Sequence, residues 1–221
     1  MSGVVVLIPI HNGGPNVTAV LEGLGALPVR RLVVDDGSTD GSGERARAAG
    51  AEVLPLRRRC GKGAALRHGL ARILAENERP DWIVFMDGDG QHLPSEVPRF
   101  LARMDGGADL LLGTRMDQGE RIPAARRRVN NAGSFVLRLM TGHAVPDTQC
   151  GFRAIRAAFA ARLGLESDGY EIETEMLMKA LRLGARWESV PVSAVYEGEP
   201  SHFRPVADTY RICMAALRHV R

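Results

Sequence analysis

The chain has 221 residues, of which 45% are hydrophobic and 25% charged, and these proportions are typical of a soluble globular protein. A formal net charge of +3 and an aromatic share of 5% argue against a nucleic-acid partner, which needs a strongly basic surface and stacking rings. The three cysteines show no paired spacing, which argues against a disulfide framework or a zinc site.

The N-terminal segment and the apolar runs bear on localisation. No apolar run approaches the roughly 20 residues that a membrane span needs. Val4 to Ile8 is short and has no basic lead-in, so it lacks the pattern of a signal peptide. Together with the unpaired cysteines, these features predict a cytoplasmic protein, and a peripheral position at the inner face of a membrane stays open.

Apolar β-branched runs alternate with helical patterns in the first half of the chain, which predicts βαβ units and a mostly parallel sheet. In chain order the expected elements are a strand at 4–8, a helix at 16–24, a strand at 31–35, a helix at 43–49, a strand at 52–56, a helix at 64–75, a strand at 82–86, a helix at 95–104, a strand at 109–113, helices at 126–140 and 173–183, and a strand near 187–192. No repeat or linker interrupts the pattern, so the sequence predicts one α/β domain.

Two carboxylates, Asp87 and Asp89, follow the expected strand 82–86. Side chains two positions apart in extended backbone point the same way, so these two can converge on one ion. Magnesium is usually held by one or two carboxylates, with substrate phosphate oxygens and water completing its shell. Gly88 leaves room for a ligand to approach the backbone, and Gln91 adds a polar group. A simple polar turn is the alternative.

A second acidic strand end lies earlier, where Asp35 and Asp36 close the strand expected at 31–35. In open α/β sheets, ligands bind in the crevice outside the carboxyl ends of the strands. Two acidic strand ends therefore predict a shared nucleotide crevice. Asp40 has a sufficient local role, because its carboxylate can cap a helix that begins near Ser42.

Lys62 stands in the segment Gly-Lys-Gly at the start of an expected helix. The segment does not match an ATP-binding phosphate loop, because the upstream glycine is missing and no Ser or Thr follows the lysine. No Gly-x-Gly-x-x-Gly follows a strand either, which disfavours a dinucleotide oxidoreductase. Approach to a nucleotide and a plain helix entry are equally open for Lys62.

Arginines offer candidate phosphate contacts, because guanidinium groups match phosphate oxygens in bidentate geometry. Arg115 closes the strand expected at 109–113 and would point into the same crevice as the acidic strand ends. Arg128 ends a run of three arginines and is the strongest candidate of the three. A solvated helix face is the alternative for any one member of that run.

The polar segment 147–153 offers two reactive side chains, Asp147 and Cys150. Cys150 would need a lowered pKa and a partner base to act as a nucleophile, and without such a partner it is expected to be packed in the interior. Asp147 is a candidate general base, or an orienting group near the acceptor. Three glutamates (Glu171, Glu173 and Glu175) begin the helix expected at 173–183, and the helix dipole accounts for one or two of them.

Five segments, in this order, resemble those of the GT-A glycosyltransferases of family two, particularly the polyprenyl-phosphate (dolichyl-phosphate) mannosyl- and glucosyltransferase group: Ile8-Pro9-Ile10-His11-Asn12, Val34-Asp35-Asp36-Gly37-Ser38-Thr39-Asp40, Gly61-Lys62-Gly63, Asp87-Gly88-Asp89-Gly90-Gln91-His92 and Gly113-Thr114-Arg115. The segment 147–152 resembles an element of the glucosyl-transferring members. The resemblance covers nearly the whole chain. It implies a single GT-A (Rossmann-like) domain over residues 1–221, with a nucleotide-sugar-binding half at 1–115 and an acceptor-binding half at 116–221.

The resemblance also implies roles for individual residues. The donor nucleotide would be bound by Pro9, His11, Asp35, Asp36, Lys62, Asp87, Gly88 and Gln91. Mg²⁺ or Mn²⁺ would be held by Asp87, Asp89 and Gln91, and the catalytic set would be Asp89, Arg115, Arg128 and Asp147. Arg115 and Arg128 would contact the acceptor or its phosphate, and Glu175 matches the glutamate that begins the later helix of the family.

The chain departs from the family's usual pattern near its N-terminus. The family usually has Tyr-Asn-Glu where this chain has His11-Asn12-Gly13, so a carboxylate beside the nucleotide is absent and the choice of donor is open. The cluster Ser201-His202-Phe203-Arg204 resembles that of a soluble bacterial branch. It could close over a diphosphate, and an ordinary surface role is the alternative.

The implied activity is inverting, metal-dependent transfer of a hexose from a UDP- or GDP-sugar to an acceptor, with a polyprenyl phosphate favoured. An acceptor phosphate is already ionised, whereas a sugar hydroxyl would need a carboxylate such as Asp147 to take its proton. Transfer to a hydroxyl and a non-catalytic sugar-nucleotide-binding module are the alternatives. A sugar-phosphate nucleotidyltransferase would need a basic Gly-rich loop after the first strand, where this chain has His11-Asn12-Gly13-Gly14.

Overall fold

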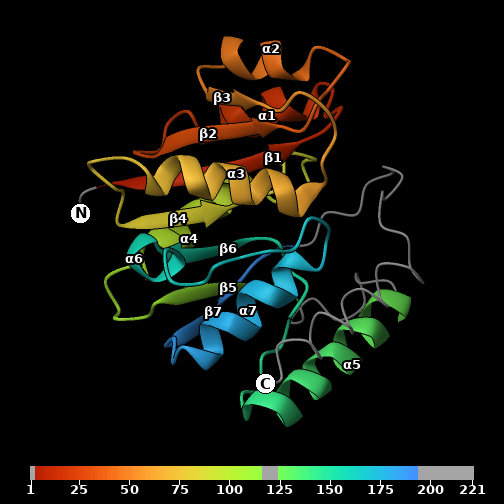
Figure 1. Ribbon diagram of the computed structural model, residues 1–221, viewed down its shortest axis with the longest axis vertical. Coiled ribbons are helices and arrows are strands. Elements are labelled where there is room, and N and C mark those ends of the chain that lie inside the picture. The colour runs from red at the N-terminus through yellow and green to blue at the C-terminus, as the bar shows by residue number, and fades with distance from the viewer. Residues whose placement is uncertain (1–2, 116–123, 194–221) are drawn as a thin grey trace.

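Seven strands form one sheet in the order β3-β2-β1-β4-β6-β5-β7 (Figure 1). This computed structural model describes residues 3–115 and 124–193. The strands are β1 (Val4–Ile10), β2 (Arg30–Asp35), β3 (Glu52–Pro55), β4 (Trp82–Phe85), β5 (Leu110–Thr114), β6 (Arg153–Arg156) and β7 (Trp187–Pro191). The helices are α1 (Asn16–Leu24), α2 (Ser42–Ala48), α3 (Lys62–Leu74), α4 (Val97–Leu101), α5 (Ala124–Thr141), α6 (Ala157–Ala160) and α7 (Ile172–Arg182).

The sheet is parallel except for β6, which runs antiparallel to both of its neighbours, β4 and β5. The other four strand pairs are parallel. The carboxyl ends of β1, β2, β4 and β5 therefore lie at one edge of the sheet, and the chain enters β6 from that same edge. This arrangement confirms the predicted α/β fold with a mostly parallel sheet.

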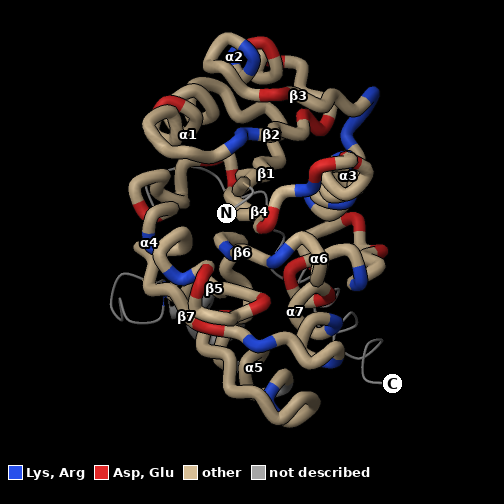
Figure 2. The backbone as a smooth tube through the Cα atoms, turned by 90° about the vertical axis from the view of Figure 1, so that its left-hand side faces the viewer, with Lys and Arg blue, Asp and Glu red and all other residues tan. Residues whose placement is uncertain are grey.

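Helices cover both faces of the sheet, because each strand carries apolar side chains on both sides. Along β1, Val5 and Leu7 belong to the core shared with α3 and α7, whereas Val6 and Ile8 belong to the core shared with α1 and α4. Figure 2 shows α1 and α4 on one side of the strands and α3, α6 and α7 on the other. None of the described helices is long and apolar enough to cross a membrane.

The first strand is longer than predicted, since β1 continues through Pro9 to Ile10 instead of ending at Pro9. The pairing of β1 with β4 ends at Leu7, which accepts the last hydrogen bond from the backbone N–H of Met86. Pro9, two residues after Leu7, also faces β4. The pairing of the two strands has already ended there, so the missing N–H of proline breaks no hydrogen bond between them. Ile10 faces β2 instead and accepts from the N–H of Asp36 at 2.8 Å.

Two further predictions of elements differ from the structure. The helix expected at 95–104 is a 3-10 turn (Pro94–Glu96) followed by the short helix α4, because Pro98 cannot supply the N–H that would join the two as one α-helix. The second difference is β6 (Arg153–Arg156), which is not among the elements expected from the sequence. The arginine at each end of β6 hides its apolar pattern in the sequence. In the structure both guanidinium groups donate to backbone carbonyl oxygens: Arg153 to those of Cys150 and Glu173, and Arg156 to those of Ala108 and Met104.

Candidate active site

The carboxylate of Asp36 fastens the loop before α3 to the end of β2. Its two oxygens accept from the backbone N–H groups of Cys60 at 2.6 Å and Gly61 at 2.8 Å. His11 Nδ1 lies 2.9 Å from the carbonyl oxygen of Asp36, which can only accept, so this nitrogen carries the proton in that contact. The predicted nucleotide residues His11 and Asp36 are thus adjacent, at the edge of the sheet where β1 and β2 end.

Asp35 and Asp40 order the turn between β2 and α2. Asp35 Oδ1 accepts from the N–H of Ser38 at 2.9 Å, and its other oxygen packs against Gly43, where any side chain would collide with it. Asp40 Oδ1 accepts from the N–H of Ser42 at 3.0 Å. The N-cap residue of α2 is Gly41 at φ 79°, so Asp40 supports the helix start from one position before the cap.

Lys62 joins the strand end of β4 to the start of α7. Its Nζ lies 2.7 Å from Asp87 Oδ1, 2.9 Å from Asp87 Oδ2 and 2.7 Å from Glu173 Oε1. Burial alone would lower the pKa of Lys62, but the two carboxylates raise it above its usual value. Burial alone would likewise raise the pKa of Asp87, and the Lys62 ammonium holds it below its usual value. Lys62 and Asp87 are therefore both charged at neutral pH.

Asp87 and Asp89 form the candidate metal site. Burial and the negative charge of Asp87 both raise the pKa of Asp89, which indicates that the two carboxylates lie close enough to repel each other. Asp89 Oδ1 accepts from the backbone N–H of Gln91 at 2.9 Å. The described residues contain no cluster of three or more His, Cys, Asp or Glu side chains that could hold a metal by themselves.

This donor set fits Mg²⁺ or Mn²⁺. Oxygen ligands suit both ions, and Mg²⁺ is usually bound by one or two carboxylates with the rest of its shell taken from substrate phosphates and water. Asp87 and Asp89 supply the two carboxylates, and a cation between them would relieve their repulsion. Gln91, on the adjoining turn, carries a neutral amide oxygen that is chemically suited to the same ions.

His92 packs beneath this turn. It is buried, its Nδ1 accepts from the backbone N–H of Asp87 at 3.1 Å, and its ring stacks on Phe152 with centroids 5.1 Å apart. Burial lowers the pKa of His92 to about 4, so the ring is neutral near pH 7. Gly88 packs against β1, since an added Cβ would lie 2.6 Å from Ile10 Cγ2. Close packing between strand ends thus already requires a glycine at this position.

Arg115 and Asp147 form a bidentate ion pair at the end of β5. Arg115 Nε lies 2.8 Å from Asp147 Oδ2, and Arg115 Nη2 lies 3.0 Å from Asp147 Oδ1. The backbone N–H of Gln149 donates to Asp147 Oδ1 at 3.2 Å. Asp147 is only 1% exposed, so its carboxylate is enclosed and both of its oxygens are engaged. The geometry makes Asp147 an orienting group for Arg115.

The segment before β6 brings the Arg115–Asp147 pair beside the acidic site. An added Cβ at Gly151 would lie 3.0 Å from Asp87 Oδ2 and 3.1 Å from Lys62 Nζ, so the backbone approaches both groups closely. Cys150 is buried as predicted, and burial raises the pKa of its thiol to about 11, which leaves it a weak nucleophile. The predicted residues from β1, β2, β4 and β5 are therefore gathered at one edge of the sheet.

Two predicted groups lie outside this description. Arg128 belongs to α5, but its side chain is outside the described residues. The cluster Ser201-His202-Phe203-Arg204 also lies outside the described residues.

The three glutamates at the start of α7 have separate roles that the helix dipole does not reveal. Glu173 pairs with Lys62, and its buried Oε2 has no hydrogen-bond partner among the described residues. Glu175 accepts from the backbone N–H groups of Glu166 and Ser167, each at 2.8 Å, and from Lys179. Glu171 Oε1 accepts from the N–H of Gly169. The helix dipole accounts for only one or two carboxylates in this turn, so the third is the signal in the sequence that some of them have another role.

The chain is similar to known proteins over most of its length. The family model described as "Glycosyl transferase family 2" matches residues 5–164. The chain is 36% identical over 175 residues to the undecaprenyl-phosphate mannosyltransferase of Micrococcus luteus, a match that covers 74% of this chain and 71% of the relative. It is 31% identical over 210 residues to the polyprenol monophosphomannose synthase of Mycolicibacterium smegmatis, a match that covers 85% of this chain and 76% of the relative.

Among solved structures, the fold is similar to that of glucosyl-3-phosphoglycerate synthase from Mycobacterium tuberculosis in complex with Mn²⁺, UDP and glucosyl-3-phosphoglycerate. The TM-score is 0.78 at 23% identity, and the match covers 99% of this chain and 80% of that one. The same enzyme is also known in complex with Mg²⁺ and UDP, with a TM-score of 0.74 at 22% identity over 99% of this chain and 79% of that one. At these identities the likeness shows a shared fold.

Proposed function

The chain belongs to glycosyl transferase family 2, and we propose that it transfers a hexose from a UDP- or GDP-sugar to a polyprenyl phosphate with inversion at the anomeric carbon. It is a glycosyltransferase related to polyprenyl-phosphate mannosyltransferases. The proposal adds the donor, the acceptor and the stereochemistry. It divides the chain into a donor half at residues 1–115 and an acceptor half at residues 116–221.

The donor would bind at the ends of β1, β2 and β4. Pro9, His11, Asp35 and Asp36 would face the nucleoside, where Asp36 fixes the loop that carries Lys62. Asp87, Asp89 and Gln91 would hold Mg²⁺ or Mn²⁺, which supplies positive charge to the departing diphosphate when bound. Mn²⁺ and Mg²⁺ complexes with UDP are known for the structurally similar synthase, and they support this assignment.

Lys62 would contribute a second, permanent positive charge at the same place. Its ammonium contacts both oxygens of Asp87 and is held from the other side by Glu173. Charge that develops on a leaving diphosphate is stabilised by groups already oriented toward it, because they do not have to reorganise during the reaction. Glu173 would therefore act as a positioning residue for Lys62.

The choice of acceptor rests on one observation, the engagement of both Asp147 oxygens by Arg115 and the N–H of Gln149. A general base must accept a proton from the reacting hydroxyl within hydrogen-bond reach. Asp147 is enclosed and its oxygens are already occupied, so it is poorly placed for that task. An ionised phosphate needs no base, and an arginine with a fixed guanidinium plane suits its recognition. Arg128 would be the second phosphate contact.

A transfer assay separates the candidate functions. The purified chain, given Mg²⁺ and a panel of UDP- and GDP-sugars, is expected to glycosylate a short polyprenyl phosphate and not free sugars. Transfer to sugars alone would refute the lipid-phosphate proposal and support a hydroxyl acceptor. Thermal stabilisation by a nucleotide sugar without transfer to any acceptor would instead support the non-catalytic binding module.

A further inference from the structure

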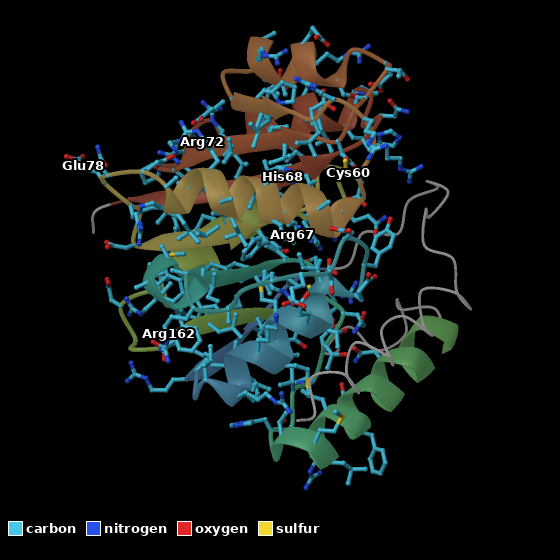
Figure 3. All side chains as sticks on the ribbon, viewed as in Figure 1. Cys60, Arg67, His68, Arg72, Glu78 and Arg162 are labelled. Atoms are coloured by element: carbon cyan, nitrogen blue, oxygen red, sulfur yellow. The ribbon has the colours of Figure 1, made fainter. Side chains whose placement is uncertain are left out.

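A second charged site lies on the outer side of α3, facing away from the acidic site. A cavity of about 350 Å³ is lined by Arg58, Arg59, Cys60, Ala64, Arg67, His68 and Asp168. Lys62 points inward to Asp87. At 3.6 residues per turn, Ala64, Arg67 and His68 lie on the opposite side of α3. Figure 3 shows Cys60 just before the start of α3 and Arg67 and His68 at the middle of that helix, away from Glu78 and Arg162.

The cavity is strongly basic because its arginines outnumber its single carboxylate. Arg58 and Arg59 are exposed, and their side chains make no hydrogen bond or ion pair with any of the residues that the structure describes. Arg57, which precedes them, is also exposed. In contrast, Arg30, Arg72 and Arg103 each contact a carboxylate within 3.0 Å. Uncompensated positive charge is therefore concentrated on this loop.

The backbone that carries these arginines is held firmly in place. Asp36 accepts from the N–H groups of Cys60 and Gly61. Gly37, at φ 68°, lies so close that an added Cβ would be 2.6 Å from the carbonyl carbon of Arg58. The loop is thus pressed onto the turn after β2. A preorganised backbone reduces the entropy lost when a ligand binds, which favours binding over a loose charged surface.

The opposite wall of the cavity is also fixed. Arg67 donates to Asp168 Oδ1 at 2.7 Å and to the carbonyl oxygen of Glu166. The loop that contains Asp168 is held in turn by Glu175, through the N–H groups of Glu166 and Ser167. His68 Nδ1 lies 2.7 Å from the carbonyl oxygen of Ala64, which fixes the ring against the helix. The two arginines of the loop therefore face a wall whose polar groups are already paired.

We propose that this cavity binds a phosphate-type anion, either the headgroup of an anionic lipid or a free phosphate compound. Guanidinium groups match phosphate oxygens in bidentate geometry, and two of them on one fixed loop give both charge and orientation. The site takes no part in the proposed transfer. It is an accessory anion site on the outer face of α3, and it does not depend on the identity of donor or acceptor.

Matched charge reversals test the proposal. The pocket variant is Arg58→Glu with Arg59→Glu, and the control is Arg79→Glu with Arg162→Glu, two exposed arginines outside the cavity. Both doubles change the net charge equally. Binding is measured in EDTA by co-sedimentation with phosphatidylglycerol-containing and pure phosphatidylcholine vesicles, and by thermal shift with inorganic phosphate against chloride at equal ionic strength. Circular dichroism melting shows whether each variant is folded.

The wild type is expected to respond to the anionic vesicles, to phosphate, or to both. The pocket variant should lose at least about tenfold in affinity, because each basic residue near an anionic surface contributes about fivefold, while the control stays within about twofold of the wild type. A response to vesicles alone would identify a lipid headgroup, a response to inorganic phosphate alone would identify a free phosphate compound, and a response to both would show that the site recognises the phosphate group that they share. Absence of any wild-type response, or an equal response of the pocket and control variants, would overturn the proposal.

Discussion

Lys62 on α3 and Glu173 on α7 meet with 2.7 Å between Nζ and Oε1, and this contact connects a helix from the first half of the chain to one from the second half. The ammonium also contacts Asp87, so one side chain bridges a carboxylate of the candidate metal site and a carboxylate of a later helix. The centroid of the Tyr170 ring also lies 5.8 Å from Nζ. The position of Lys62 therefore depends on residues from two distant parts of the sequence, the end of β4 and the start of α7.

Glu173→Gln should weaken the binding of the donor and destabilise the fold. The substitution leaves the buried Lys62 with one carboxylate instead of two, and loss of a charged hydrogen bond typically costs about 1.5–3 kcal/mol. Urea unfolding would measure the stability, and titration of a nucleotide sugar with Mg²⁺ would measure donor affinity. Glu171→Gln is the matched control, since that carboxylate does not contact the lysine among its described interactions. Equal effects of the two substitutions would show that Glu173 has no special role.

Asp89→Asn should abolish metal-dependent transfer without unfolding the protein. Asp89 is at the surface-facing end of the acidic turn, and the substitution removes one negative charge from the proposed metal shell while keeping an oxygen that can accept from Gln91 N–H. Transfer assays with Mg²⁺, Mn²⁺ and EDTA, together with a thermal melt, would check this. Full activity of the wild type in EDTA would contradict the metal assignment itself.

Arg115 and Asp147 should act as one unit toward the acceptor. If Asp147 serves by orienting Arg115, then Arg115→Ala and Asp147→Asn should each raise the KM for a polyprenyl phosphate, by roughly ten- to hundredfold for loss of the charged contact. The double variant should be little worse than Arg115→Ala alone, because coupled residues are not additive. Donor affinity should change less than acceptor KM. Strictly additive losses in a double-mutant cycle would show that the two residues act independently and would contradict this prediction.

Glu175 should make the stability of the protein sensitive to acid. Burial alone would raise the pKa of Glu175, but Lys179 and the backbone N–H groups of Ser167 and Glu166 hold it below its usual value. The pKa of an unfolded glutamate is about 4.3. The stability that Glu175 contributes is therefore fully present above that pH and is lost as the pH falls through the lower pKa of the folded state.

Glu175→Gln is the test of this acid sensitivity. The variant should be less stable than the wild type at pH 7, and the difference should shrink as the pH is lowered below about 4.3. Urea unfolding across a pH series would show this. Glu188→Gln, at an exposed ion pair with Arg103, serves as a control that should change little. A difference that stays constant with pH would mean that the charge of Glu175 is not the source of its contribution.

The parts of the site that follow strand ends are predictable from sequence. Asp35, Asp87 and Arg115 each come after an apolar run, so the period and polarity of the sequence suffice to place them at one edge of a sheet. The roles of Glu173 and Glu175 are not predictable in this way. Their partners, Lys62 and the N–H groups of residues 166 and 167, are fixed by how α7 packs on α3 and on the preceding loop.

The strand β6 is the main fold feature that sequence patterns do not reveal. It has four residues, and a charged side chain stands at each end, which conceals the apolar pair between them. Its stability comes from hydrogen bonding to β4 and β5 on both sides, a tertiary effect that no local propensity contains. The basic character of the cavity beside residues 57–59 is equally hidden, because a charge run carries no information about which of its members find partners.

The antiparallel strand β6 lies between the two strands that lead to Asp87 and to Arg115. It separates β4, which leads to Asp87, from β5, which leads to Arg115, so the two strand ends stand two strand spacings apart, about 10 Å. The connection into β6 must return through this gap, and it brings Asp147 to Arg115 and Gly151 to Asp87 on the way. The segment 142–152 can therefore vary in sequence and change what surrounds Arg115 and Asp87, while β1, β2 and β4 keep their register.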